Sequence, residues 1–280
     1  MLRVFAAQPT TGVFAVDDAY EPLRELRLGG AAWTVTRHAW LPHTELGLFA
    51  LVHDDARDPG DGGLAGGEVE VYTVGGHWLG VYPLGPGALD VVLWAAGQAG
   101  DFAGLDHRAA AGIAEVGYRL PGLPGKPWLR AGVNAASGDG NPGDGEHHTF
   151  FNGLPTNHLY YGFADQLAFQ NLVNPSLQLR LAPHPWVAVN AFVHGFWLAS
   201  RDDVRYAGTG AYDRKAFGYA AQASGGQRDV GTEFDLVVAV TPHRTATVEG
   251  GVAWLEGGDA FRAARDRDVL FGYLSLELRY

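Results

Sequence analysis

The last eleven residues alternate strictly between two kinds of side chain. Apolar residues and one glycine take every second position, and mainly polar or aromatic residues take the positions between them: Leu270, Gly272, Leu274, Leu276, Leu278 and Tyr280 against Phe271, Tyr273, Ser275, Glu277 and Arg279. Because successive side chains of a β-strand point to opposite faces, this pattern predicts a strand. Such a strand fits the wall of a membrane β-barrel, with its apolar face in lipid, or a soluble sandwich that buries that face.

The same alternation recurs upstream and predicts an all-β chain. Forty glycines and 33 aromatic residues beside a single methionine are typical of a sheet-rich protein. No cysteine is present, so disulfides and thiolate metal sites are excluded. The pattern predicts about twelve strands, which begin near Leu2, Leu26, Glu45, Val69, Leu89, Arg108, Trp128, Ser176, Trp186, Arg228, Thr245 and Val269.

The connectors between these strands fall alternately into a short and a long class. Every short connector contains proline, which cannot donate to a strand ladder and is expected to mark where pairing stops. Short turns at one rim and long loops at the other are typical of bacterial outer-membrane barrels. The short connectors are residues 41–43, 82–87, 121–127, 182–185 and 241–244, and the long ones are residues 8–24, 54–67, 100–107, 138–174, 200–227 and 256–268.

Charge follows the same division. The net charge is -11, and all of it belongs to the long connectors, because the cations and anions of the strands and short turns balance. A soluble sheet has no reason to segregate charge in this way and should carry Lys and Glu on its outward faces. The acidic balance, with few clustered cations, also excludes a nucleic-acid partner.

A bilayer can be crossed by helices or by a closed barrel. The best helix candidate, residues 79–97, is interrupted by Pro83, Pro86 and Asp90, so we expect no membrane-spanning helix. The first residues, MLRVFAAQPT, hold one cation and a short apolar run. We therefore expect a secretory signal peptide to lie outside this numbered chain.

Residues 136–171 resemble the alginate-export family of outer-membrane barrels. The matching pieces include Ser137-Gly138-Asp139, Asp144, Thr149-Phe150, Pro155-Thr156-Asn157-His158, Asp165 and Asn171. The likeness continues through Arg201-Asp202-Asp203 and residues 231–236 into the closing strand, and it is looser before residue 100. The resemblance implies one barrel domain over residues 1–280, part of a larger wall whose opening strands precede Leu2. It also implies export of an anionic exopolysaccharide through a positively lined pore.

If Leu278, Leu179 and Phe234 face lipid, their neighbours face the lumen. Strand parity then predicts inward charges of both signs: Arg3, Arg119, Arg130, Arg180, Arg279 and His194, with Asp90, Glu115, Glu233, Asp235, Glu249 and Glu277. Asn134, Gln178 and Asn190 share that face. Two interpretations stay open. The charges form cross-strand ion pairs that rigidify a wet interior, or the arginines form a ladder for the carboxylates of a uronate polymer.

Metal and enzyme interpretations are weaker. Asp139, Asn141, Asp144 and Glu146 offer oxygen ligands for calcium, but their spacing also fits ordinary turns. His147 and His148 should point to opposite faces, so we expect neither they nor His158 to hold a structural metal. We expect no cofactor. Glu233 and Asp235 share a strand face, as a glycosidase pair would, but lumen parity explains them equally. We expect a protein that is not an enzyme.

The sequence favours an outer-membrane porin or exporter that passes an acidic polysaccharide or another hydrophilic solute. Gating is expected from the long loops, with residues 138–174 folding inward. Its partners would be outer-membrane lipid, the polysaccharide and periplasmic export components. Two alternatives remain: a general porin without polymer preference, and a soluble or surface β-protein that binds glycans on Trp33, Trp78, Trp94 and Trp197.

Overall fold

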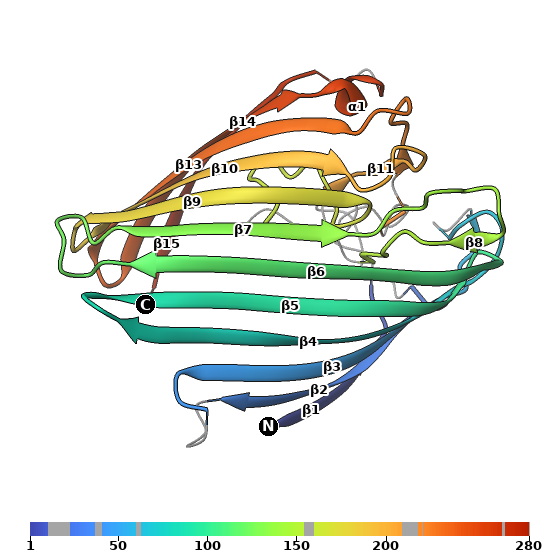
Figure 1. Cartoon of the computed structure of the whole chain (residues 1–280), viewed down its shortest axis with the longest axis horizontal. Helices are drawn as coiled ribbons and strands as arrows, with labels where there is room; N and C mark the ends of the chain where they lie inside the picture. The colour runs from blue at the N-terminus through green and yellow to red at the C-terminus, as the bar shows by residue number, and fades with distance from the viewer. Residues whose placement is uncertain are drawn as a thin grey trace.

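The computed structural model describes residues 1–10, 23–36, 41–59, 63–153, 160–208, 218–219, 221–264 and 267–279. Twelve long strands form one antiparallel sheet (Figure 1): β1 (Leu2–Ala7), β2 (Leu26–Thr36), β3 (Thr44–Asp55), β4 (Val69–Leu84), β5 (Gly87–Phe102), β6 (Leu105–Arg119), β7 (Trp128–Ala136), β9 (Leu172–His184), β10 (Val187–Leu198), β13 (Asp229–His243), β14 (Ala246–Gly257) and β15 (Val269–Leu278). The prediction of twelve strands is confirmed.

Four smaller elements accompany the long strands in the described residues. Strand β8 (Glu146–His147) pairs in parallel with β6, and β11 (Arg205–Tyr206) pairs with β12 (Ala221–Gln222). A single turn of helix, α1 (Asp259–Arg262), lies between β14 and β15. In the described residues no helix is long and apolar enough to cross a membrane.

Each long strand pairs with its neighbour along the chain, so the sheet is an up-and-down wall. Figure 1 shows the wall strongly curved, with β15 passing behind β6 and β7. Strands β1 and β15 are the two edges, and the described sheet is open between them. Because β1 runs toward the long-connector rim and β15 runs away from it, a direct pairing of these edges would be antiparallel. Closure through further strands would therefore require an even number of them.

The two rims differ as the connector lengths predict. The turns that contain or adjoin Pro42, Pro83, Pro124, Pro183 and Pro242 lie at the short-turn rim, and Asp58 and Asp144 lie at the long-connector rim. Asp266, expected beside them, is outside the described residues.

One connector and three strand ends differ from the prediction. Residues 100–107 are not a long connector, because β5 and β6 pair as far as Phe102 and Leu105 around a turn at Ala103 and Gly104. Both turn residues have positive φ, 55° and 86°, as a tight hairpin turn requires. Proline also does not stop pairing where we expected. Pro83, Pro183 and Pro242 each lie one residue inside the end of a strand.

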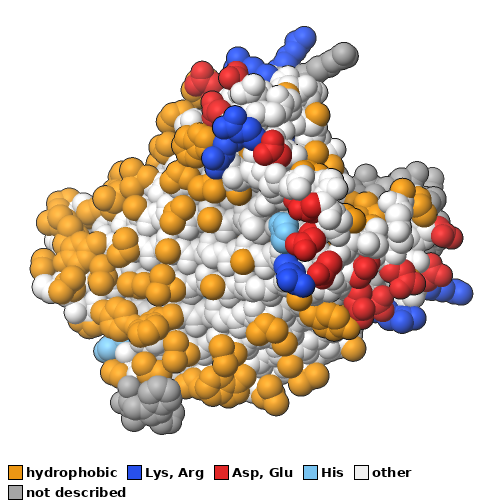
Figure 2. Space-filling model, turned by 45° about the vertical axis from the view of Figure 1, so that its right-hand side comes forward, with side chains coloured by type: hydrophobic (Ala, Val, Ile, Leu, Met, Phe, Trp, Pro, Cys, Tyr) orange, Lys and Arg blue, Asp and Glu red, His pale blue; other side chains and the backbone are white. Residues whose placement is uncertain are grey.

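The convex face of the wall is apolar. Leu274, Leu276 and Leu278 are 80%, 63% and 67% exposed, and Phe234 and Leu179 share their face. Figure 2 shows orange apolar side chains spread over the wall, with red and blue side chains gathered toward the long-connector rim. A soluble sandwich would bury these leucines. Their exposure fits an apolar band in contact with lipid.

The concave face is filled at one end by the chain itself. We use the name inward connector for residues 137–171, which join β7 to β9. Its Phe150, Phe163 and Phe169 are at most 8% exposed. They belong to one cluster with Ala111 of β6 and Leu255 of β14, on the inner side of the wall. The predicted inward folding of this loop is confirmed for the part of it that the structure describes.

Candidate functional site

Strand register decides which side chains share the concave face. Partners directly opposite one another in a ladder lie on the same face. Trp128 of β7 pairs with Arg119 of β6 on one side and with Arg180 of β9 on the other. These three side chains therefore form a row across three neighbouring strands at the short-turn rim.

This row borders a concave pocket of about 380 Å³, which we name the basic pocket. It is lined by Val81, Ala88, Asp90, Arg119, Lys126, Trp128, Arg130, Arg180 and Ala182. Four of these residues are cations and one is an anion, so the pocket carries a net positive charge. Sequence parity missed Lys126, because that residue lies in a turn between strands.

Arg130 is neutralised within this pocket. Its guanidinium forms ion pairs with Asp90 at 2.6 Å and with Glu115 at 3.0 Å. It also lies 4.3 Å above the ring of Trp128. The indole of Trp128 donates a hydrogen bond to Asp90 Oδ2 at 2.6 Å. A side chain at Gly117 would collide with both groups of that bond, because its Cβ would lie 2.4 Å from the carboxylate and 2.6 Å from the indole nitrogen.

Arg119, Lys126 and Arg180 have no ion-pair partner among the described residues. Asp90, the carboxylate among the described lining residues, is held by Arg130, which also holds Glu115. The interior of the wall at this rim therefore offers three cations to a ligand. The interpretation of cross-strand ion pairs fits Arg130, whose two partners lie on neighbouring strands, and the ladder of arginines for a uronate polymer stays a prediction.

The other predicted charges lie elsewhere on the wall. Arg3 and Arg279 are on or next to the two edge strands, where Arg279 pairs with Glu277 at 2.8 Å. Glu249 accepts a hydrogen bond from the Tyr273 hydroxyl at 2.7 Å. The structure thus brings together Arg119, Arg130 and Arg180 and leaves Arg3 and Arg279 apart from them.

His194, Glu233 and Asp235 lie beneath the inward connector. All three are at most 4% exposed. Ala164 of the connector donates its N–H to Glu233 Oε1 at 2.8 Å, and His194 Nε2 lies 3.7 Å from Asp235 Oδ2. These groups share the inner face, but they are buried and do not line open space, and Glu233 holds the connector through its bond to Ala164. Glu233 and Asp235 therefore have no room for a sugar between them, as a glycosidase pair would need.

The motif residues in the inward connector have structural contacts. The N–H of Asp139 donates to Asp203 Oδ2 at 3.0 Å, and Thr149 donates its hydroxyl to the same oxygen. Burial raises the pKa of the Asp203 carboxyl, and these two hydrogen bonds oppose that rise. The Asn171 side chain accepts from the N–H of Ser200 at 2.7 Å and donates to the carbonyl of Val204 at 2.9 Å.

These contacts pin the inward connector to the segment after β10. Asp165 lies in the connector with a positive φ of 56°, and Asp144 caps an exposed turn by accepting the N–H of Glu146. Pro155, Thr156, Asn157 and His158 lie outside the described residues. In the ranges that the structure describes, no three His, Asp or Glu side chains are grouped to hold a metal ion.

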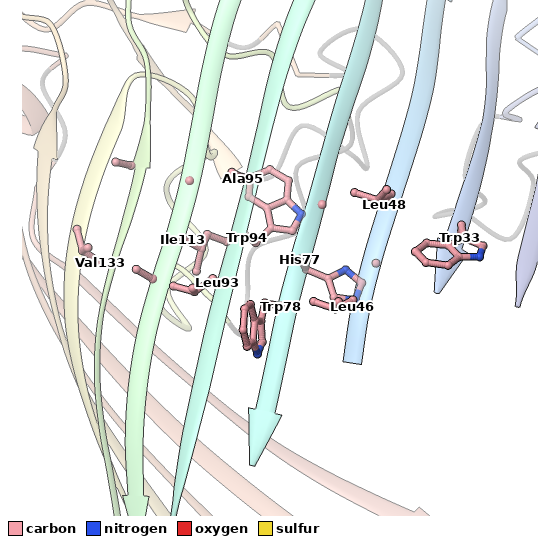
Figure 3. Close-up of a pocket in the computed structure, with 15 residues that line it drawn as sticks. Trp33, Leu46, Leu48, His77, Trp78, Leu93, Trp94, Ala95, Ile113 and Val133 are labelled. Atoms are coloured by element: carbon pink, nitrogen blue, oxygen red, sulfur yellow. The ribbon is translucent and has the colours of Figure 1, made fainter. Parts of the chain in front are cut away.

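The tryptophans do not gather in one glycan site. Trp33, Trp78 and Trp197 are 40% to 44% exposed on the convex face, beside Leu48, Leu93 and Val193. Trp94 alone of the four lies on the concave face, where it packs against Phe150 and Phe169. Figure 3 shows Trp33, Trp78 and Trp94 along β2, β4 and β5. Indole rings on the convex face fit the aromatic girdle of a membrane wall.

A curved antiparallel wall with an apolar outer face and a charged inner face defines the class of outer-membrane β-barrel transport proteins. The family model described as alginate export matches residues 65–271. The chain belongs to the alginate export family. No curated protein matches it. Among solved structures, the outer membrane protein OprD from Pseudomonas aeruginosa is similar, with a TM-score of 0.47 and 12% identity over 99% of this chain and 76% of that chain.

Proposed function

We propose that this protein passes an acidic polysaccharide across the outer membrane and that the basic pocket binds its carboxylates. The observation that carries the proposal is the group of Arg119, Lys126 and Arg180 on the inner face, three cations without an ion-pair partner in the part of the chain that the structure describes. A guanidinium binds a carboxylate through two hydrogen bonds and keeps its charge at any physiological pH. Membership of the alginate export family supports the same substrate class.

The proposed mechanism needs no covalent chemistry. The polymer moves along the inner wall from the short-turn rim, which would face periplasmic export components, toward the long-connector rim. The inward connector narrows the path at that second rim, because its aromatic residues occupy the concave face. Arg3, Arg279 and Glu277 would line the path beside the edge strands. Glu233 would hold the connector in place through Ala164, with His194 and Asp235 buried beside it on the inner face.

Ion selectivity tests the proposal. In planar bilayers the wild type should prefer anions at low salt, and the double variant Arg119→Glu with Arg180→Glu should reverse or abolish that preference. The difference should shrink as salt rises, since the Debye length is about 10 Å at 0.1 M. Block of the current by hexagalacturonate should weaken in the same variant.

A matched control uses arginines on the outer face. Arg27 and Arg108 are 73% and 68% exposed on the convex side, so Arg27→Glu with Arg108→Glu makes the same change of charge away from the lumen. That control should leave selectivity unchanged. A wild type without anion preference, or a pocket variant that behaves like the control, would identify a general porin whose charges serve as structural ion pairs.

A further inference from the structure

A second pocket lies on the concave side, at the other end of the wall. It has a volume of about 390 Å³ and opens between β2–β5 and the inward connector. We name it the aromatic pocket, because six of its lining residues are aromatic: Phe5, Phe49, Trp94, Phe150, Phe151 and Phe169. It lies within the size range of ligand sites.

Some of the aromatic rings in this pocket keep part of their surface exposed. Phe49 and Trp94 stack at 6.0 Å with an interplanar angle of 17°, and both are only partly buried. Phe150 meets Trp94 edge-on at 6.3 Å, so it supports the ring from the side of the connector. Phe5 is 49% exposed. The pocket thus offers aromatic surface on a rigid frame, as a stacking site requires.

The described residues that line this pocket include no Lys, Arg, Asp or Glu, in contrast to the basic pocket. Four polar side chains are among its described lining residues: His53, Thr73, Gln98 and Asn152. Gln98 is fully engaged, because it donates to Thr73 Oγ1 and to the carbonyl of Phe151 and accepts the N–H of Phe151 at 2.7 Å. A carboxylate would lose its hydration here without gaining a Lys or Arg partner among the described lining residues. The matching ligand group is uncharged and has an apolar face.

Both pockets lie along the same strand. Asp90 borders the basic pocket, Trp94 and Gln98 border the aromatic pocket, and all three are on the inner face of β5. At about 3.3 Å per residue, Trp94 and Gln98 lie roughly 13 and 26 Å beyond Asp90 along the strand. A polymer that follows the wall from the basic pocket therefore reaches the aromatic pocket next.

We propose that the aromatic pocket is a second subsite, which takes the apolar C–H face of an uncharged pyranose ring by stacking on Phe49 and Trp94. This inference rests on the proposed function. It adds that the inner wall recognises two parts of the same polymer at separate places: its carboxylates at the short-turn rim and the faces of its uncharged rings nearer the long-connector rim.

Two oligosaccharides of equal length separate the subsites. Block of single-channel current is measured with maltohexaose, which is neutral, and with hexagalacturonate, which is acidic. Phe49→Leu and Trp94→Leu, made singly, should each weaken block by maltohexaose roughly two- to tenfold, because each removes one stacking ring and keeps an apolar side chain. Arg119→Glu with Arg180→Glu should weaken block by hexagalacturonate and leave maltohexaose unchanged.

Trp78→Leu is the matched control. Trp78 lies on the neighbouring strand β4 but is 44% exposed on the outer face, so its loss should change neither block (Figure 3). The sugar subsite is overturned if maltohexaose does not block the wild-type channel. It is also overturned if maltohexaose blocks Phe49→Leu and Trp94→Leu as strongly as it blocks the wild type. Block by indole without block by maltohexaose would also overturn it, in favour of a site for small apolar molecules. A failure of the hexagalacturonate arm alone would instead contradict the proposed function.

Discussion

At the scale of residues, the point where the inward connector meets the wall depends on a glycine. Gly162 has a φ of 87°, a region that side chains rarely adopt, and a Cβ there would lie 2.4 Å from Glu233 Oε1. The glycine therefore lets the connector approach close enough for Ala164 to donate its N–H to that carboxylate. This hydrogen bond in turn gives the buried carboxyl group of Glu233 a partner.

Replacing Gly162 by alanine should release this part of the connector. We expect a local cost of about 1–3 kcal/mol from the backbone conformation and the contact with Glu233. Limited proteolysis of the folded protein should cut the connector faster, and channel conductance should rise. Gly140→Ala is the control in the same connector, because a Cβ there meets nothing within 4 Å. Equal cleavage of both variants would show that Gly162 does not hold the connector.

At the scale of elements, the sequence predicts the strands well because each strand has one lipid-compatible face. Alternation survives wherever such a face is needed, as in β15 and β13. It fails at residues 100–107, where Asp, Gly and His resemble a loop although the neighbouring strands extend the ladder. The sequence predicts which strand residues of the basic pocket face inward but not which of them form ion pairs. Parity turns Arg130 inward, but its pairing with Asp90 and Glu115 depends on register across three strands.

The inward connector was harder to predict in detail. Its direction follows from its length, but the burial of Phe150 and Phe169 against Trp94 depends on contacts between residues far apart in sequence. No periodicity marks such residues. The sequence therefore does not reveal the aromatic pocket, since half of its rings come from a segment without regular structure.

The faces of β15 give a direct test of the membrane wall. Leu276 is 63% exposed on the outer face, and its neighbour Ser275 pairs with Glu249 on the inner face. Leu276→Arg should lower the free energy of unfolding by about 2–4 kcal/mol, as a cation does near the middle of a lipid-facing strand. Ser275→Arg should cost much less. Chemical unfolding in lipid vesicles measures both, and equal costs would show that this face does not contact lipid.

At the scale of the whole molecule, the two rims differ in charge and in length of connector. The long connectors carry the acidic excess, and the short turns hold Lys126 and the basic pocket close to their rim. Acidic loops at the outer mouth would repel an anionic polymer in either direction, whereas the basic pocket at the other rim would attract it. A polymer that enters from the periplasm meets the basic pocket first only if the short-turn rim faces the periplasm. The proposed function therefore depends on this orientation.

Single cysteines test that orientation, because the chain has none of its own. Gly143 at the long-connector rim and Gly122 at the short-turn rim are suitable positions, since a Cβ at either meets nothing within 4 Å. In intact cells that export the chain behind a secretory leader, a membrane-impermeant maleimide should label Gly143→Cys, because long loops face the exterior. It should label Gly122→Cys only after the outer membrane is permeabilised. Leu276→Cys, which faces lipid, should stay unlabelled in both conditions. The reverse labelling pattern for the two glycine positions would show the opposite orientation of the wall. The basic pocket would then lie at the cell surface, where it could not receive a polymer from the periplasm.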